Sequence, residues 1–367
     1  MNSKTSIDTL QTPAILVHRS RLERNIRAMQ SVCDANGVEL RPHIKTHKLV
    51  PVARMQLAAG ARGLTCAKLS EAEAMLASGV RELFVAHSIV DSRQTPRIAA
   101  LHNALDDFRL AVTSDAQAAA LDNVIAAARI GKKIRVMMAV DTGLGREGVR
   151  SLEAAQKLAA QVARSAHLEL AGFYTHEGHF YSGLVSGAES RISALVEKLC
   201  ATRDAIDKTL PVWPGCSVTA AAIAKVSEKR IQSVRPGAYV FGDLANTRTT
   251  GVMRDDDVAL HVLSTVVDKP EPGLALIDAG SKTFSSDRTP DGISAIAADG
   301  RDITVARVNE EHGYLRGSAV DSLKIGDRIL FTPAHVCTVV NLTDEVIVTD
   351  GENILETWRV EARGKTQ

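Results

Sequence analysis

The alternation of short apolar runs with longer helical patterns is the feature of this sequence that most restricts its fold. From Ala14 to about Val218 the chain contains eight such units. Parallel strands require this pattern, because each strand returns to the same sheet only through a crossover, usually a helix. The eight units predict a (β/α)8 barrel of the TIM type, with its active site at the carboxyl ends of the strands. The predicted strands are Ala14–Val17, Glu39–Pro42, Gly63–Cys66, Leu83–Ala86, Phe108–Val112, Ile134–Val140, Leu168–Phe173 and Val212–Val218.

The pattern changes to strands without helices near Val258, which predicts a second, all-β domain. We expect residues 14–245 to form the barrel. Residues 255–367, together with residues 1–13, should form the β-domain. The boundary is placed between residues 245 and 255 because the chain there is polar and poorly periodic. The clearest strand candidates in the second part are Leu260–Val267, Leu274–Ile277, Arg328–Phe331 and Glu345–Val348, separated by Gly, Pro and Asp turns.

Charge and cysteine usage exclude several classes of protein. The 44 basic and 43 acidic side chains nearly cancel, unlike the one-sided basic surface of a nucleic-acid-binding protein. Five cysteines without a CxxC pair argue against a disulfide framework, and no run resembles a signal peptide or a membrane span. These features predict a cytoplasmic protein that acts on small molecules, not on nucleic acid or a membrane.

A basic motif, Arg41–Lys48, follows the second predicted strand and places Lys45 where a barrel presents its catalytic residues. A lysine there can hold an aldehyde as a Schiff base, provided that nearby cations such as His43, His47 or Lys48 lower its pKa. Taken alone, such a motif is more often a basic turn of solvated lysines. The motifs that follow in the sequence favour the functional interpretation.

Several motifs in order resemble the D-threonine aldolase and D-serine dehydratase-like family, pyridoxal-phosphate enzymes with the alanine-racemase-like barrel fold. The resemblance covers nearly the whole chain and implies pyridoxal 5'-phosphate as cofactor, a homodimer, and a lyase that acts on small D-3-hydroxy amino acids. The motifs are Thr12–Val17, Leu22–Ile26, Arg41–Lys48, His335–Cys337 and Asn341–Asp344.

The resemblance also assigns cofactor-binding residues. It implies that Lys45 binds the cofactor covalently and that Lys48 is a solvated residue. It also implies that Arg146, in the loop Asp141–Gly148, lies beside the phenolic oxygen of the cofactor. Arg235 would contact the pyridine nitrogen, and its permanent charge would make the ring a weaker electron sink. The remaining cofactor candidates are Gly237, Ala238 and Tyr239 after Arg235, the hydroxyls of Ser217 and Thr219 before an alanine-rich helix, and Tyr174 or Tyr181 around the seventh strand.

His335 and Cys337 are the candidate metal ligands. On a strand-like stretch their spacing puts both side chains on one face, and imidazole with thiolate favours zinc over magnesium. Manganese or cobalt could also occupy such a site, because supply partly decides which divalent metal is bound. An isolated HxC pair is usually core packing, but in the resembled family it forms the metal site.

The reaction itself is left open between two lyases. His179, after the seventh strand, is a candidate base for the β-hydroxyl and favours retro-aldol cleavage to glycine and an aldehyde, which we take as the leading reading. Cys337 in place of aspartate favours instead a D-serine or 3-hydroxy-D-aspartate dehydratase that releases an oxo acid and ammonia. Remote alternatives are a racemase with Tyr314 as second base and a non-catalytic cofactor-binding protein. His312 is a tentative site residue, and His176, Glu177, Asp278 and Glu311 have no assigned role.

Overall fold

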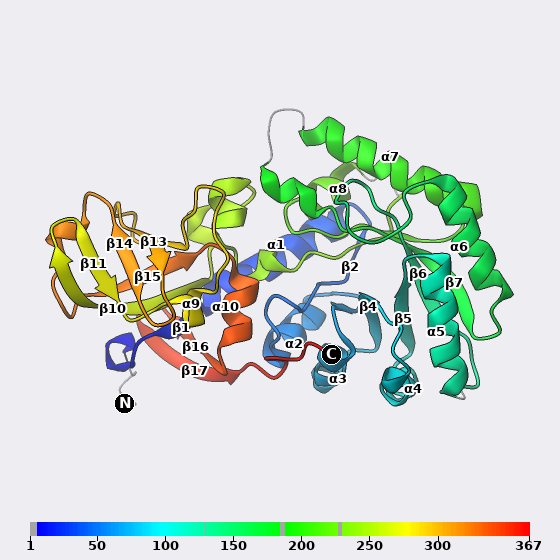
Figure 1. Ribbon diagram of the computed structural model, residues 1–367, viewed down its shortest axis with the longest axis horizontal. Helices are drawn as coiled ribbons and strands as arrows, with labels where there is room; N and C mark the ends of the chain where they lie inside the picture. The colour runs from blue at the N-terminus through cyan, green and yellow to red at the C-terminus, as the bar shows by residue number, and fades with distance from the viewer. Residues whose placement is uncertain (1–5, 129, 184–187, 227–229) are drawn as a thin grey trace.

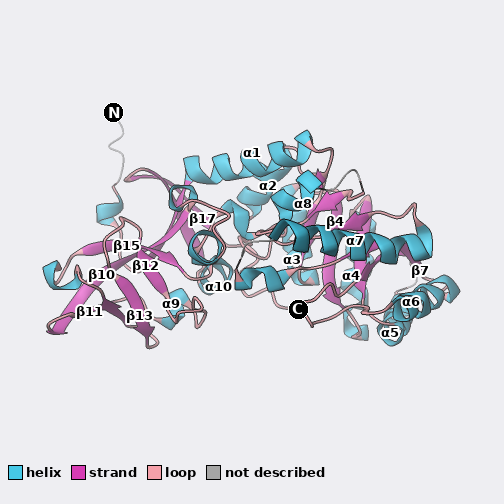
Figure 2. Ribbon diagram, turned by 90° about the horizontal axis from the view of Figure 1, so that it is seen from above, coloured by secondary structure: helices cyan, strands magenta, loops and turns pink. Residues whose placement is uncertain are grey.

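The computed structural model describes residues 6–128, 130–183, 188–226 and 230–367. Two groups of strands lie side by side along the long axis of the molecule (Figure 1). One group is parallel and covered by helices, and the other is a large, mostly antiparallel sheet. Seen from above, helices α1 (Arg19–Ala35) and α10 (Val336–Leu342) lie near the junction of the two groups (Figure 2).

The parallel group is a barrel of alternating strands and helices, as the sequence predicted. Six strands form one parallel sheet in sequence order, and the short strands β2 (Glu39–Leu40) and β9 (Ser233–Val234) form a parallel pair. Single contacts connect the two sheets, since His43 bridges to Thr65 and the Gln232 N–H donates to the Val212 carbonyl. The six strands are β3 (Leu64–Cys66), β4 (Glu82–Ser88), β5 (Asp107–Val112), β6 (Ile134–Ala139), β7 (Leu168–Tyr174) and β8 (Val212–Trp213).

The helices follow the strands in the expected alternation. Two of them begin at serine caps, because the Ser114 hydroxyl accepts the Gln117 N–H and the Ser151 hydroxyl accepts the Ala154 N–H. The helices of the barrel part are α1, α2 (Val50–Ala58), α3 (Leu69–Met75), α4 (Thr95–Ala104), α5 (Asp115–Ala127), α6 (Leu152–Arg164), α7 (Ala188–Asp207) and α8 (Ala220–Val226).

The strand predicted as the first of the barrel belongs instead to the other sheet. Strand β1 (Ala14–His18) pairs antiparallel with β10 (Leu260–Glu271) and parallel with β16 (Glu345–Asp350). The eighth barrel strand is β9 instead, which was not predicted from the sequence. An apolar run indicates a strand but not its partners, so the error concerns pairing and not the presence of the strand. Lys45 therefore follows the first barrel strand, β2, rather than the second.

The second part of the chain forms a nine-stranded sheet in the order β11-β14-β13-β12-β15-β10-β1-β16-β17. The predicted all-β character holds for the sheet, but two short helices interrupt it, α9 (Ser281–Phe284) and α10. The strands not yet placed are β11 (Leu274–Ile277), β12 (Ala295–Ala297), β13 (Thr304–Val308), β14 (Gly313–Arg316), β15 (Arg328–Pro333) and β17 (Asn353–Arg359).

Side chains fill the barrel below the strand ends. The Trp213 ring lies between two guanidinium groups, since the Cζ atoms of Arg41 and Arg109 are each 4.3 Å from its centroid. Arg41 is buried and pairs with Glu82 at 2.8 Å. The barrel is thus a packed core that supports a site at one end. None of the described helices meets the length and hydropathy needed to cross a membrane.

Candidate active site

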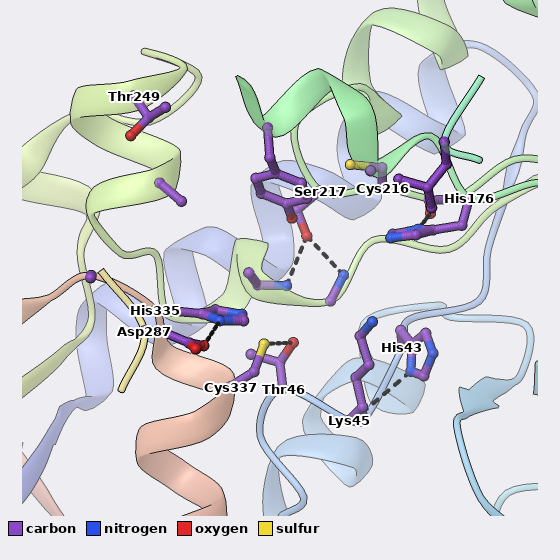
Figure 3. Close-up of a pocket in the computed structure, with 18 of the residues that line it drawn as sticks. His43, Lys45, Thr46, His176, Cys216, Ser217, Thr249, Asp287, His335 and Cys337 are labelled. Carbon is purple, nitrogen blue, oxygen red and sulfur yellow. Dashed lines mark hydrogen bonds and ion pairs between the residues drawn. The ribbon is translucent and has the colours of Figure 1, made fainter. Parts of the chain in front are cut away.

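A cavity of about 750 Å³ lies at the carboxyl ends of the barrel strands, where the β-domain meets the barrel (Figure 3). Apart from Ala245 and Thr249, the barrel residues that line it lie in segments that follow a strand, as expected for this fold. The barrel contributes among others Lys45, Thr46, Arg146, His176, Tyr181, Cys216, Ser217, Arg235, Gly237 and Ala238, and the β-domain contributes Asp287, Arg288, Thr289, Pro290, His335 and Cys337.

Lys45 and Lys48 occupy different environments. Lys45 lines the cavity between His43 and the pair Thr46–Cys337 (Figure 3). Lys48 is buried and forms an ion pair with Glu71 at 2.8 Å, so the prediction that it is solvated is wrong. The backbone at Lys48 has φ 53°, in the left-handed region, where the chain turns before α2. The structure thus leaves Lys45 as the lysine of this motif that faces the cavity.

The two histidines of the motif do not supply positive charge. Burial lowers the pKa of His43 well below its ordinary value, and it lowers the pKa of His47 to about 3. Both rings are therefore neutral at neutral pH, contrary to the suggestion that they act on Lys45 as cations. His43 lines the cavity, whereas His47 is fully buried and does not line it.

Ser217, Gly237 and Ala238 form a cradle of hydrogen-bonding groups. The Ser217 hydroxyl accepts the N–H groups of Gly237 at 3.0 Å and Ala238 at 2.8 Å. A Cβ atom on Gly237 would lie 2.7 Å from the Thr46 hydroxyl oxygen, so glycine alone permits this approach of the two loops. Two adjacent N–H groups and a hydroxyl suit a phosphate.

Two residues predicted to bind the cofactor lie behind this cradle. The Thr219 hydroxyl donates to Glu177 at 2.8 Å and is fully buried. The Tyr239 hydroxyl accepts from Gln56 at 3.0 Å. Neither lines the cavity, because the chain turns them to the opposite side of the segments that carry Ser217 and Ala238. Both residues adjoin segments that line the cavity, but the sequence does not show the directions of their side chains.

Arg235 is fixed at the cavity wall. Its guanidinium donates to the carbonyls of Trp213 at 3.1 Å and Thr175 at 2.5 Å. Burial lowers its pKa to about 10, which still leaves it charged at neutral pH. A Cβ atom on Gly215 would lie 2.6 Å from the Cβ of Arg235, so this glycine makes room for the arginine. A fixed cation here would oppose protonation of a ring nitrogen bound beside it.

His176 lines the cavity and had no role assigned from the sequence. Its Nδ1 lies 2.6 Å from the Gly215 carbonyl oxygen, so Nδ1 carries the proton and Nε2 is an acceptor. Burial lowers its pKa to about 3, which makes the ring a weak base. The signal that could have identified it is its position directly after strand β7, where barrels present functional residues. Arg146 also lines the cavity and is half exposed, 3.8 Å from Glu147.

His179 does not line the cavity. Its ring packs on Phe180, with 4.8 Å between the centroids, and lies against Gly143. Tyr181, by contrast, lines the cavity and is half-buried. Tyr174 packs on Phe84 in the barrel core, and its hydroxyl has no partner among the described residues. His312 and Tyr314 also lie outside the cavity of their own chain.

The candidate metal ligands lie at the start of a helix, not on a strand as predicted. His335 caps α10 and Cys337 lies in its first turn, and both line the cavity. The Nδ1 atom of His335 is 2.7 Å from an Asp287 oxygen, and the Cys337 sulfur is 3.2 Å from the Thr46 hydroxyl. Within the described ranges, no group of three His, Cys, Asp or Glu side chains could hold a metal ion.

The electrostatics of this pair nevertheless suit a metal. Burial alone would raise the pKa of the Cys337 thiol, but the positive charge of His335 outweighs it and lowers the pKa overall. The carboxylate on Nδ1 leaves the Nε2 atom of His335 available as a ligand. Two protein ligands would leave the remaining positions to substrate or water. Asp287, which the sequence did not suggest, is thus the residue that orients His335.

The sequence and the structure both match known proteins. Residues 17–245 match the family described as alanine racemase, N-terminal domain, and residues 259–349 match the putative serine dehydratase domain. The D-threo-3-hydroxyaspartate dehydratase of Delftia sp. is 34% identical over 90% of this chain and 91% of its own. The D-threonine aldolase of Arthrobacter sp. is 29% identical over 97% of this chain and 93% of its own.

Solved structures show the same architecture. The D-threonine aldolase of Filomicrobium marinum superposes with a TM-score of 0.88 and 26% identity, covering 100% of both chains. The Delftia dehydratase superposes with a TM-score of 0.84 and 30% identity, covering 97% of this chain and 99% of its own. Variants of that dehydratase, in which a histidine and a cysteine two positions apart are replaced by alanine, superpose as well, and the cysteine variant is in a metal-free form.

Proposed function

Because the chain belongs to the alanine-racemase-like family of pyridoxal-phosphate lyases that includes D-threonine aldolases and D-serine dehydratases, we propose that it dehydrates D-3-hydroxy amino acids. The substrate would lose its α-proton and its β-hydroxyl as one water. The resulting enamine would become an imine, and hydrolysis of the imine would take up one water and give an oxo acid and ammonia. A homodimer and a cytoplasmic location stay predictions from the family resemblance and the cysteine usage.

The observation that carries this proposal is the placement of the bases. Dehydration requires a base at the α-carbon, and Lys45 is the amine of the lysine motif that faces the cavity. Aldol cleavage requires a base at the β-hydroxyl, but His179 lies outside the cavity, and His176, which lines it, is a weak base. The leading sequence-based interpretation, an aldolase, had His179 or a metal-bound water as this base. Because His179 lies outside the cavity, the aldolase takes second place.

The residues that line the cavity fit pyridoxal phosphate. Lys45 would hold it covalently, Ser217 and the N–H groups of Gly237 and Ala238 would bind its phosphate, and Arg235 would lie beside its ring nitrogen. When bound, the cofactor withdraws electrons from the α-carbon of the substrate. Lys45 would take up the α-proton at Nζ.

His335 and Cys337 would hold a divalent metal on the side of the cavity that the β-domain forms. Such an ion acts as a Lewis acid that helps a hydroxyl to leave. Asp287 holds His335 by its Nδ1 atom, and Thr46 lies beside the Cys337 sulfur, so both ligands are oriented by this chain. The related dehydratase with a metal-free cysteine variant supports this assignment.

Retro-aldol cleavage is the second candidate, because the aldolase from Filomicrobium marinum matches the whole chain. One assay separates the two reactions. The holoenzyme with zinc or manganese is incubated with D-threo-3-hydroxyaspartate, D-serine and D-threonine, and glycine, oxo acid and ammonia are measured. We expect oxo acid and ammonia in equal amounts. Glycine and an aldehyde without ammonia would show that the protein is an aldolase.

A further inference from the structure

We propose that Arg288 selects substrates that carry a second carboxylate on the β-carbon, as 3-hydroxyaspartate does. This inference rests on the proposed lyase function and names its substrate class. Arg288 belongs to the β-domain and lines the cavity together with His335 and Cys337. Those two residues are the proposed metal ligands for the β-hydroxyl, so the other substituent of the β-carbon would lie on the same side of the cavity.

The guanidinium of Arg288 is available for a ligand. Its side chain is exposed, and among the residues that the structure describes it forms no hydrogen bond or ion pair. Its acidic neighbour Asp287 is already engaged, because one oxygen contacts His335 at 2.7 Å and accepts from the Thr338 hydroxyl at 3.2 Å. The carboxylate nearest in sequence therefore does not neutralise Arg288.

The backbone that carries Arg288 is anchored on both sides. Before it, the Asp287 N–H donates to the Ser285 hydroxyl at 3.1 Å. After it, the Thr289 hydroxyl donates to the Ile293 carbonyl at 3.1 Å and accepts the Ile293 N–H at 3.0 Å. The loop thus fixes the starting point of a long side chain whose charged end is unpaired. This arrangement resembles the way a rigid scaffold presents a binding group.

The other cations of the cavity have partners or assigned roles. Arg235 donates to two carbonyls, Lys45 is the proposed covalent attachment point, and Arg146 lies near Glu147. Arg288 is left without such a role. Arginine binds carboxylates through two parallel hydrogen bonds, so a dicarboxylate would gain a contact that the hydrogen of serine or the methyl of threonine cannot make.

Binding can be tested without turnover. D-Aspartate and D-alanine lack the β-hydroxyl and differ by one carboxylate, so each is titrated into the holoenzyme while the absorbance of the bound cofactor is followed. We expect D-aspartate to bind at least about tenfold more tightly than D-alanine. In Arg288→Gln this preference should fall by about ten- to a hundredfold, with D-alanine changed less than about twofold. Arg288→Lys keeps the charge but loses the two parallel hydrogen bonds of the guanidinium, so its preference for D-aspartate should be intermediate.

Arg248→Gln is the matched control, because Arg248 is exposed on the segment Ala245–Thr249 but does not line the cavity. It removes the same charge and should keep the preference for D-aspartate. Equal losses for D-aspartate and D-alanine in Arg288→Gln would place this arginine at the α-carboxylate or in a structural role and overturn the proposal. A wild type without preference would overturn it too. If the wild type neither binds these ligands nor converts any D-3-hydroxy amino acid, the proposed function itself fails, and the inference with it.

Discussion

The Nζ atom of Lys48 lies 2.8 Å from a carboxylate oxygen of Glu71, and both side chains are almost completely buried. Lys48 also donates to the Ala362 carbonyl at 3.3 Å, so the ion pair connects the lysine loop, helix α3 and the carboxyl-terminal segment. The two lysines of one short motif thus have separate tasks. Lys45 faces the cavity, and Lys48 holds the loop that carries it.

Replacing Lys48 by Met should destabilise the fold by about 3–5 kcal/mol, because Glu71 would be left as a buried, unpaired charge. The free energy of unfolding from urea denaturation would measure this. Arg81→Gln is the control, since the ion pair of Arg81 with Asp106 is exposed and its loss should leave the free energy of unfolding nearly unchanged. Equal, small effects of the two substitutions would show that the buried pair does not stabilise the loop.

Replacing Lys45 by Ala should abolish the covalent link to the cofactor. The purified protein would lose the absorbance band of the bound cofactor, and borohydride reduction would no longer add the cofactor mass to the chain. Lys48→Met, where it still folds, should keep both signals. A covalent adduct that survives in Lys45→Ala and disappears in Lys48→Met would reverse the assignment of the two lysines.

The sequence predicted which segments form strands, because local patterns determine this. It did not predict which strands pair with each other in a sheet. Apolar runs correctly indicated strands in both domains, yet Ala14–His18 pairs with strands about 250 and 330 residues away, which no local pattern reveals. Strand β9 is only two residues long and too short to give a periodic signal. Near Val258 the sequence changes from alternating strand and helix patterns to strand patterns alone. This change correctly indicated the second sheet.

The same distinction applies to the site. Lys45, Ser217, Arg235 and Gly237 were identified from motifs and line the cavity. The direction of a side chain depends on backbone angles that the sequence does not give, so Thr219 and Tyr239 were placed on the wrong side. Asp287 and Arg288 could not be predicted, because only the packing of the β-domain on the barrel brings their loop to the strand ends.

Replacing Cys337 by Ala should lower the metal content of the protein and leave its cofactor content unchanged. The reason is that Cys337 has a lowered pKa and can become a thiolate ligand. Cys216→Ala is the matched control, because Cys216 lines the same cavity but burial raises its pKa to about 12. Metal and cofactor contents are measured after dialysis, by elemental analysis and absorbance. Full metal occupancy in Cys337→Ala would contradict the assignment of this residue as a ligand.

Buried His261 and its half-buried neighbour His18 should make stability fall at acidic pH. Burial lowers the pKa of His18 to about 4 and that of His261 to about 3, and the two rings lie 5.2 Å apart between centroids. In the unfolded chain both would have a pKa of about 6.5. The unfolded state therefore binds more protons below that pH, and stability is lost progressively as the pH falls from about 6.5 toward 4 and below.

Replacing His261 by Leu should flatten this dependence, because one of the two titrating groups is removed and the remaining ring no longer faces a second histidine. The test is the urea midpoint between pH 7.5 and pH 4.5 for the wild type, His261→Leu and the exposed control His312→Gln. The control should follow the wild type, because His312 is exposed and lies outside the His18–His261 pair. A wild-type slope retained in full by His261→Leu would assign the acid sensitivity to other groups, such as the carboxylates in ion pairs.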